Sequence, residues 1–92
     1  MGEPNHIDEP IHLIAADQRR QWLSGRRILL ESYLPQHPEI AQSEELLLDL
    51  IYHEVRLREL MGEQVSLADY LRRFPQLKAQ LEPLFEVHSA MA

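Results

Sequence analysis

The longest uninterrupted helical pattern of the sequence runs from Leu46 to Met61, and it constrains the fold more than any other stretch. Apolar residues recur here at the three- and four-residue spacing of an α-helix, and Gly62 ends the pattern. The apolar residues form two adjoining stripes on this helix. A helix with two apolar stripes has neighbours on both sides, so we expect it to be the central helix of a small bundle. The stripes are Leu46, Leu50, His53, Leu57 and Leu60, and Leu47, Ile51 and Val55.

Glycine, serine and proline residues divide the rest of the sequence into further helices. Asp8 is suited to cap a first helix that runs to Ser24, because Asp accepts hydrogen bonds from the free N–H groups of a helix start. Gly25 can adopt the left-handed conformation that ends this helix, and Trp22 is its largest apolar side chain. A short helical segment over residues 29–34 follows, and the next two prolines are expected to close it.

The second half of the chain continues this alternation of caps and stops. Ser43 is expected to cap the central helix, and Ser66 a short helix that Pro75 ends. A last helix begins near Gln76, and Pro83 predicts a kink or a break within it. The sequence therefore predicts an all-α fold, a compact bundle of about five helices, of which three are longer and two are short.

The chain contains an internal repeat at an offset of 37 residues. The repeated unit is a long helix, a glycine stop, an extended link, a short helix with a Tyr-Leu pair, and a proline that turns the chain. We favour a true repeat over chance agreement between Leu-rich helices, because glycine, tyrosine and proline agree in register. The units span about residues 15–42 and 52–79, within a single helical domain of residues 8–90 that follows a flexible lead-in of residues 1–7. The matched pairs are Gly25 and Gly62, Ile28 and Val65, Leu30 and Leu67, Tyr33 and Tyr70, Leu34 and Leu71, Pro38 and Pro75, and Ile40 and Leu77.

The charge balance and the absence of cysteine limit what the protein can bind. Nine basic and fifteen acidic side chains give a net charge of −6, which repels phosphate backbones and anionic membrane surfaces. The lack of cysteine excludes disulfides and thiolate metal sites. The acidic N-terminal sequence does not resemble a signal peptide, and no window is apolar enough for a membrane span. We therefore expect a cytoplasmic protein that binds neither nucleic acid nor membranes.

The sequence contains no complete catalytic or metal-binding motif. His53 and Glu54 begin the HExxH zinc motif, but Leu57 stands where the second histidine ligand is required. His53 is expected at the edge of the core, and Glu54 is expected to pair with Arg58 one turn later. The glycines and serines form neither a phosphate-binding loop nor a nucleophile motif. We expect no enzymatic activity, no cofactor, no metal and no small-molecule substrate.

One basic cluster lies on both sides of the first glycine stop: Arg19, Arg20, Arg26 and Arg27. Guanidinium groups are suited to bind an acidic or phosphorylated protein partner. The alternative is a solvated face that balances acidic residues elsewhere in the fold, and it is favoured because most charged clusters are of this kind.

A set of motifs gives the chain a resemblance to a known family. The residues from about 15 to 90 resemble the helical N-terminal extension that precedes the catalytic domain in a group of bacterial Hanks-type serine/threonine protein kinases. The usual final helix of that extension is straight, and Pro83 departs from this pattern. The matching motifs are W-x-x-G at Trp22 to Gly25, Y-L-x-x-x-P at Tyr33 to Pro38, L-I-x-x-E-V-x-L-R-E-x-x-G at Leu50 to Gly62, Y-L-x-R-F-P at Tyr70 to Pro75, and F-E-x-H at Phe85 to His88.

The resemblance implies a regulatory or protein-interaction module that acts beside a kinase. The chain itself has no Gly-rich loop and neither an HRD nor a DFG sequence, so no kinase activity is expected of it. The expected partner is a kinase domain in the same polypeptide or another signalling protein, and the alternative is a self-association module or free-standing adaptor that forms a homodimer. The expected contact residues are Arg19, Arg20, Arg26 and Arg27, with Arg72 and Arg73 as the corresponding pair of the second repeat.

The remaining motif residues are expected to support the structure. Tyr33 and Tyr70 are expected to pack in the core with hydrogen-bonded hydroxyls, in preference to a role as phosphorylation sites. The residues assigned to the core or to turns are Trp22, Gly25, Tyr33, Leu50, Ile51, Glu54, Gly62, Tyr70, Phe74, Pro75 and Phe85.

Overall fold

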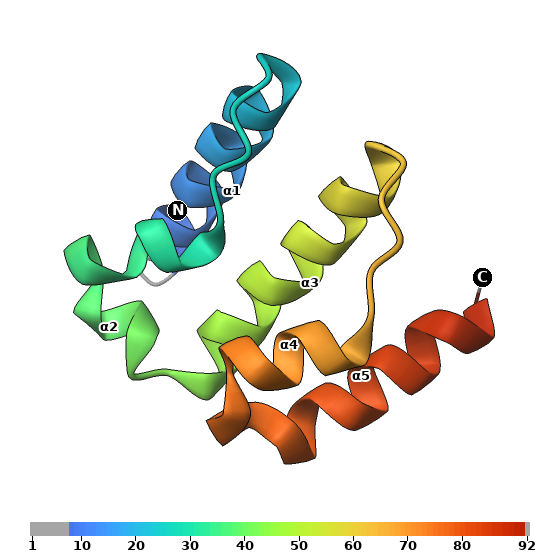
Figure 1. Cartoon of the computed structure of the whole chain (residues 1–92). Helices are drawn as coiled ribbons and strands as arrows, with labels where there is room; N and C mark the ends of the chain where they lie inside the picture. Colours follow the sequence, from blue (N-terminus) through green and yellow to red (C-terminus); the bar gives the residue numbers. More distant parts are fainter. Residues whose placement is uncertain (1–7, 92) are drawn as a thin grey trace, which may run out of the picture. The chain divides into compact units, whose positions relative to one another are not determined.

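The computed structural model describes residues 8–91, and it is helical as the sequence predicts, with no strand in that part of the chain (Figure 1). It forms two compact units, the first ending at Leu57 and the second beginning at Arg58. The expected lead-in, residues 1–7, lies outside the described residues. The elements are α1 (Asp8–Leu23), 3₁₀ turns at Leu30–Ser32 and Leu34–Gln36, α2 (Pro38–Ala41), α3 (Glu44–Leu60), α4 (Leu67–Arg73), a 3₁₀ turn at Pro75–Leu77, and α5 (Lys78–Met91).

The first unit is held together by a buried polar network around the link that follows α1. The carboxylate of Glu54 on α3 accepts hydrogen bonds from the backbone N–H of Leu30 (2.8 Å) and the Gln18 side-chain amide (2.9 Å). The carbonyl of Ile28 accepts hydrogen bonds from the Gln18 amide (3.0 Å) and the Trp22 indole (2.7 Å). Both α1 and α3 therefore fix the link through buried polar groups, which are costly to leave unpaired. The apolar core of this unit is Ile11, Ile14, Trp22, Leu30, Ile40, Leu47, Leu50, Ile51, Val55 and Leu57.

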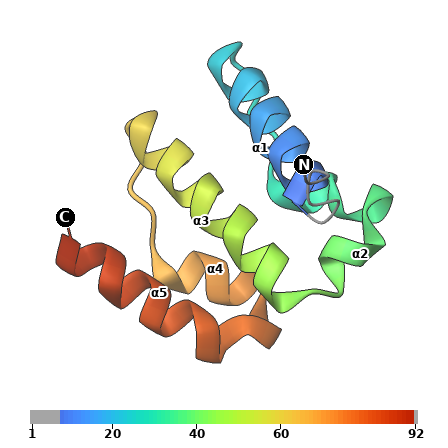
Figure 2. The same ribbon diagram turned by 180° about the vertical axis from the view of Figure 1, so that it is seen from behind.

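The second unit is built around Tyr70, whose side chain is fully buried. Its ring lies 5.7 Å from that of Phe85 and 6.5 Å from that of Phe74, and α4 packs against α5 (Figure 2). The guanidinium of Arg58 lies over the same ring and donates hydrogen bonds to Asp69 (3.0 Å) and to the Tyr70 hydroxyl (3.4 Å). An aromatic side chain thus combines apolar burial with a polar contact at its outer end.

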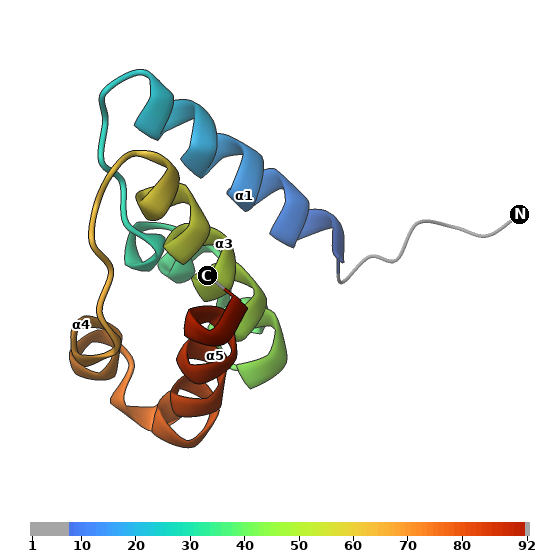
Figure 3. The same ribbon diagram turned by 90° about the vertical axis from the view of Figure 1, so that its right-hand side faces the viewer.

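The internal repeat is present in the backbone as well as in the sequence. Gly25 and Gly62 both have positive φ angles, +95° and +89°. In each case the residue after the glycine donates a hydrogen bond five residues back, from Arg26 to the Gln21 carbonyl (2.8 Å) and from Glu63 to the Arg58 carbonyl (2.9 Å). This is the Schellman arrangement that ends a helix on a left-handed glycine. Figure 3 shows the extended segment that follows the second glycine stop and leads to α4.

The two repeats also have the same backbone conformation after the extended links that follow the glycine stops. His37 and Phe74 stand 37 residues apart, each before a proline, and their backbone angles are nearly identical, φ −136° and ψ 67° against φ −133° and ψ 65°. Two equivalent segments therefore turn the chain in the same way into the next helix.

Replacing either glycine stop with alanine is expected to lower the free energy of unfolding by about 1 kcal/mol. A Cβ atom at Gly25 or Gly62 would meet nothing within 4 Å, so the cost comes from the left-handed backbone alone and should be similar at both sites. Chemical denaturation of Gly25→Ala and Gly62→Ala checks this, with the asparagine variants as controls because asparagine tolerates this conformation better. A substitution that leaves stability unchanged at one site only would contradict the equivalence of the two stops.

The caps of α3 and α4 agree with the sequence, while the closing roles assigned to Pro35 and Pro38 were wrong, since Pro35 lies within a 3₁₀ turn and Pro38 begins a helix. Ser43 and Ser66 accept hydrogen bonds from the first turns of α3 and α4 (3.3 and 3.2 Å), as predicted. The expected helix over residues 29–34 is instead a pair of 3₁₀ turns, and Pro38 begins α2 rather than closing the segment. Proline is accepted there because the N–H groups of a first turn have no partner within the helix.

The last helix is the element in which Pro83 predicts a kink or a break. It begins at Lys78, and Pro83 lies within it without a break. Pro83 removes one hydrogen bond to the carbonyl of Ala79. Both residues are exposed, so water can bind the carbonyl that loses its partner.

Candidate functional site

The six arginines expected to contact a partner are divided between the two units, four in the first and two in the second. Arg19 and Arg20 lie exposed on α1, and Arg26 and Arg27 lie exposed on the link that follows it. The remaining two lie on α4 of the second unit.

Arg20 is oriented by neighbours within the first unit. Its guanidinium binds the carboxylate of Asp17 (2.6 Å), and the hydroxyl of Tyr33 donates a hydrogen bond to the other carboxylate oxygen (2.8 Å). The hydrogen bond from the Tyr33 hydroxyl is the main cause that lowers the pKa of Asp17, and the hydrogen bond from Arg20 is the next. Burial and then the hydrogen bond to Asp17 raise the pKa of Tyr33. Tyr33 is thus half-buried with a bonded hydroxyl, and Asp17 holds Arg20 at the surface.

Arg27 has a structural role that the sequence did not indicate. Its guanidinium lies 5.0 Å from the centre of the Trp22 ring, a cation–π contact at the edge of the first core. Arg26 is exposed, and its backbone N–H closes the glycine stop.

Arg72 and Arg73 belong to the second unit and are not the counterparts of the first four arginines. Both bind the carboxylate of Asp69 (3.1 and 3.8 Å), and Arg73 lies 4.6 Å from the centre of the Tyr70 ring. Burial opposes the charge on Asp69, yet Arg58 and these two arginines lower its pKa overall. The assignment of Arg72 and Arg73 as a corresponding pair was wrong, because the offset of 37 places proline and glutamine, not arginine, at positions 35 and 36.

The residues assigned to the core or to turns take several positions. Trp22, Leu50, Ile51, Glu54, Tyr70 and Phe74 are buried, Tyr33 and Phe85 are half-buried, and Gly25, Gly62 and Pro75 are exposed at turns. Arg58 binds Glu63 and Asp69 (2.9 and 3.0 Å), while Glu54 binds the link of the first unit. The expected pairing of Glu54 with Arg58 is therefore replaced by contacts outside α3. Although the two residues lie one turn apart, each binds residues on other segments.

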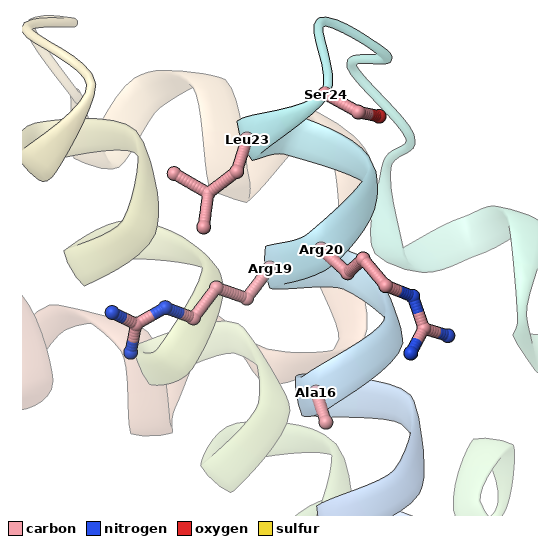
Figure 4. Close-up of a pocket in the computed structure, with 5 residues that line it drawn as sticks. All are labelled: Ala16, Arg19, Arg20, Leu23 and Ser24. Atoms are coloured by element: carbon pink, nitrogen blue, oxygen red, sulfur yellow. The ribbon is translucent and has the colours of Figure 1, made fainter.

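A shallow depression of about 410 Å³ lies on the outward side of α1. It is lined by Ala16, Arg19, Arg20, Leu23 and Ser24 (Figure 4). The two arginines extend in opposite directions from the helix, and Leu23 lies on the same side as Arg19. An apolar strip between two cations is suited to a protein surface with apolar and acidic groups.

Leu13 extends this strip by one turn. Its side chain is 65% exposed, and that of Leu23 is 60% exposed. We call Leu13, Ala16, Arg19, Arg20 and Leu23 the α1 surface. Its apolar members were not predicted from the sequence, although they lie at helical spacing opposite the face that includes Trp22.

The repeat shows that this face is unusual. Leu13 and Arg20 of α1 correspond to Leu50 and Leu57 of α3, which are 0% and 4% exposed. Two positions of the α1 surface are therefore exposed where α3 buries their counterparts, whereas Leu23 and its counterpart Leu60 (67% exposed) are both exposed. Large exposed apolar side chains gathered on one face mark sites of protein interaction.

His53, the first residue of the incomplete zinc motif, lies where its surroundings lower its pKa. Its ring is half-buried, and burial followed by Arg19 and Arg56 lowers its pKa, which favours the neutral imidazole. Within residues 8–91 the histidine and acidic side chains do not gather in a group of three or more that could hold a metal ion. No helix in the same part of the chain is long and apolar enough to cross a membrane.

No protein-family model, curated protein or solved structure matches this chain.

Proposed function

We propose that this chain is a non-catalytic protein-interaction module that binds its partner through the α1 surface. The observation that carries the proposal is the set of exposed apolar side chains of Leu13, Ala16 and Leu23 beside Arg19 and Arg20. A partner that fits it has an apolar helix face bordered by carboxylates, because these carboxylates would pair with the two guanidinium groups.

The setting proposed for this module is a bacterial serine/threonine kinase in the cytoplasm. The motif resemblance supports the kinase association, and the acidic net charge fits a partner surface that is not nucleic acid. The module would act on the kinase domain of the same polypeptide or on another signalling protein, without catalytic residues of its own.

Site-specific photo-crosslinking in the source cells tests the binding surface. The photo-reactive residue p-benzoylphenylalanine replaces Ala16, which lines the depression, or Ala41 as the control, which is exposed at the end of α2. We expect a protein adduct from position 16 and none from position 41, identified by mass spectrometry.

The double variant Arg19→Glu and Arg20→Glu is expected to reduce the adduct by about tenfold, because charge reversal turns attraction into repulsion. Its circular dichroism should match that of the parent protein, since exposed ion pairs contribute little to stability. Equal labelling from both positions, or none from either, would overturn the proposal.

A further inference from the structure

The second unit carries a groove between the link that precedes α4 and the helix α5. Val65 and Leu67 line it from the link side and Phe85 from α5, and all three are half-buried. Glu82 and Glu86 border the groove and are exposed. The groove measures about 500 Å³, and we call it the acidic groove.

The two repeats differ in the side chains that hold their links. In the first unit, Gln18 and Trp22 donate hydrogen bonds to the link and hold it against α1. The corresponding residues of the second repeat are Val55, whose side chain has no donor, and Glu59, whose carboxylate binds the ring of His88 (2.7 Å).

The exposure of the two links differs accordingly. Leu30 of the first link is fully buried, whereas its counterpart Leu67 lies at the wall of the acidic groove and is only half-buried.

The acidic groove and the α1 surface are complementary in chemistry. The groove has apolar walls and a pair of glutamates one turn apart, Glu82 and Glu86. The α1 surface has an apolar strip and a pair of arginines, Arg19 and Arg20. An α-helix is the element that an apolar groove with charged edges accommodates best, and opposite charges at the edges fix its orientation.

We propose that the acidic groove of one copy of this chain binds the α1 surface of a second copy. The inference rests on the proposed function and names the partner of the α1 surface as the chain itself. Because two different surfaces meet, the contact is head-to-tail, and a copy that has used one surface keeps the other available for a further copy. The net charge of −6 on every copy opposes association, so the complex is expected to form only at high protein concentration and to depend on the local charge pairs.

Sedimentation velocity of the purified 92-residue chain tests the inference. Over a series from about 10 µM to about 1 mM, the average mass of the parent protein should rise above 10.8 kDa and continue to rise without a plateau at the dimer. One variant, Arg19→Glu with Arg20→Glu, alters only the α1 surface. The other, Glu82→Arg with Glu86→Arg, alters only the acidic groove.

Each variant alone should remain a monomer, because its altered surface is repelled by the intact surface of the next copy. An equimolar mixture should associate again, because the intact groove of the first variant binds the intact α1 surface of the second. The mass of that mixture should continue to rise beyond the dimer, because the altered surfaces, glutamates on α1 of one variant and arginines in the groove of the other, also carry opposite charges. A matched control, Glu39→Arg with Glu44→Arg, reverses two exposed glutamates outside both surfaces and should associate like the parent protein.

Other outcomes overturn the inference in distinguishable ways. If the groove variant associates like the parent protein while the α1 variant does not, the α1 surface pairs with something other than the groove. If the parent protein remains a monomer at every concentration, self-association is excluded. In that case, a photo-crosslinked adduct between position 16 and a different protein would leave the proposed function intact. The absence of any adduct would overturn both the proposed function and the inferred self-association.

Discussion

Replacing Tyr70 with alanine is expected to lower the free energy of unfolding by about 3 to 5 kcal/mol, a large part of the stability of a small chain. The ring is fully buried, packs with Phe74 and Phe85, and lies beneath the guanidinium groups of Arg58 and Arg73. Truncation leaves a cavity and removes the aromatic and cation–π contacts together.

The matched control is Tyr70→Phe, which keeps the ring and removes the hydroxyl. This variant should lose about 1 kcal/mol or less, because the bond from Arg58 to the hydroxyl is long, 3.4 Å, and Arg58 keeps Glu63 and Asp69. Urea denaturation followed by circular dichroism measures both variants. An equal loss in the two would show that the hydroxyl, and not the ring, stabilises the second unit.

Replacing Glu54 with alanine is expected to lower the free energy of unfolding by about 2 to 4 kcal/mol. The carboxylate is fully buried and accepts hydrogen bonds from the N–H of Leu30 and the amide of Gln18. Its removal leaves these buried donors without their acceptor, which costs more than the loss of an exposed hydrogen bond.

The control for this position is Glu54→Gln, which keeps one acceptor oxygen at a similar place and should lose less than half as much. The fluorescence of Trp22, the single tryptophan of the chain, reports on unfolding because its indole binds the same link through Ile28. A loss of less than about 0.5 kcal/mol in Glu54→Ala, the range of ordinary surface substitutions, would contradict a structural role for this network. Comparing fluorescence with circular dichroism also shows whether the two units unfold in one transition.

The helix pattern and its stops could be predicted because they depend on neighbours in the chain. Apolar spacing in α3, the caps Ser43 and Ser66, and the left-handed glycines act through the local backbone, and the structure confirms them. The prolines were predicted less well, because proline can begin a helix as readily as end one. Which role it takes depends on the backbone angles of the preceding residue, such as His37.

Only part of the candidate site could be predicted from the sequence. The charge of the arginines near Gly25 made them candidates for a binding site. The sequence does not show that Arg20 binds Asp17 whereas Arg27 lies over the ring of Trp22. Leu13 and Leu23 look like core residues in a list of apolar positions, and their exposure depends on which face of α1 packs inward.

The amino-acid order alone determined the all-α class, the repeat of 37 residues and the position of each glycine stop, because all of these follow from spacing and local conformation. Only the tertiary structure decided that Glu54 binds the link and not Arg58, and that Leu13 of α1 is exposed while its counterpart Leu50 on α3 is buried. The physical reason is that burial and hydrogen-bond partners depend on residues distant in the chain, such as Gln18 and Glu54, which the fold brings within 2.9 Å.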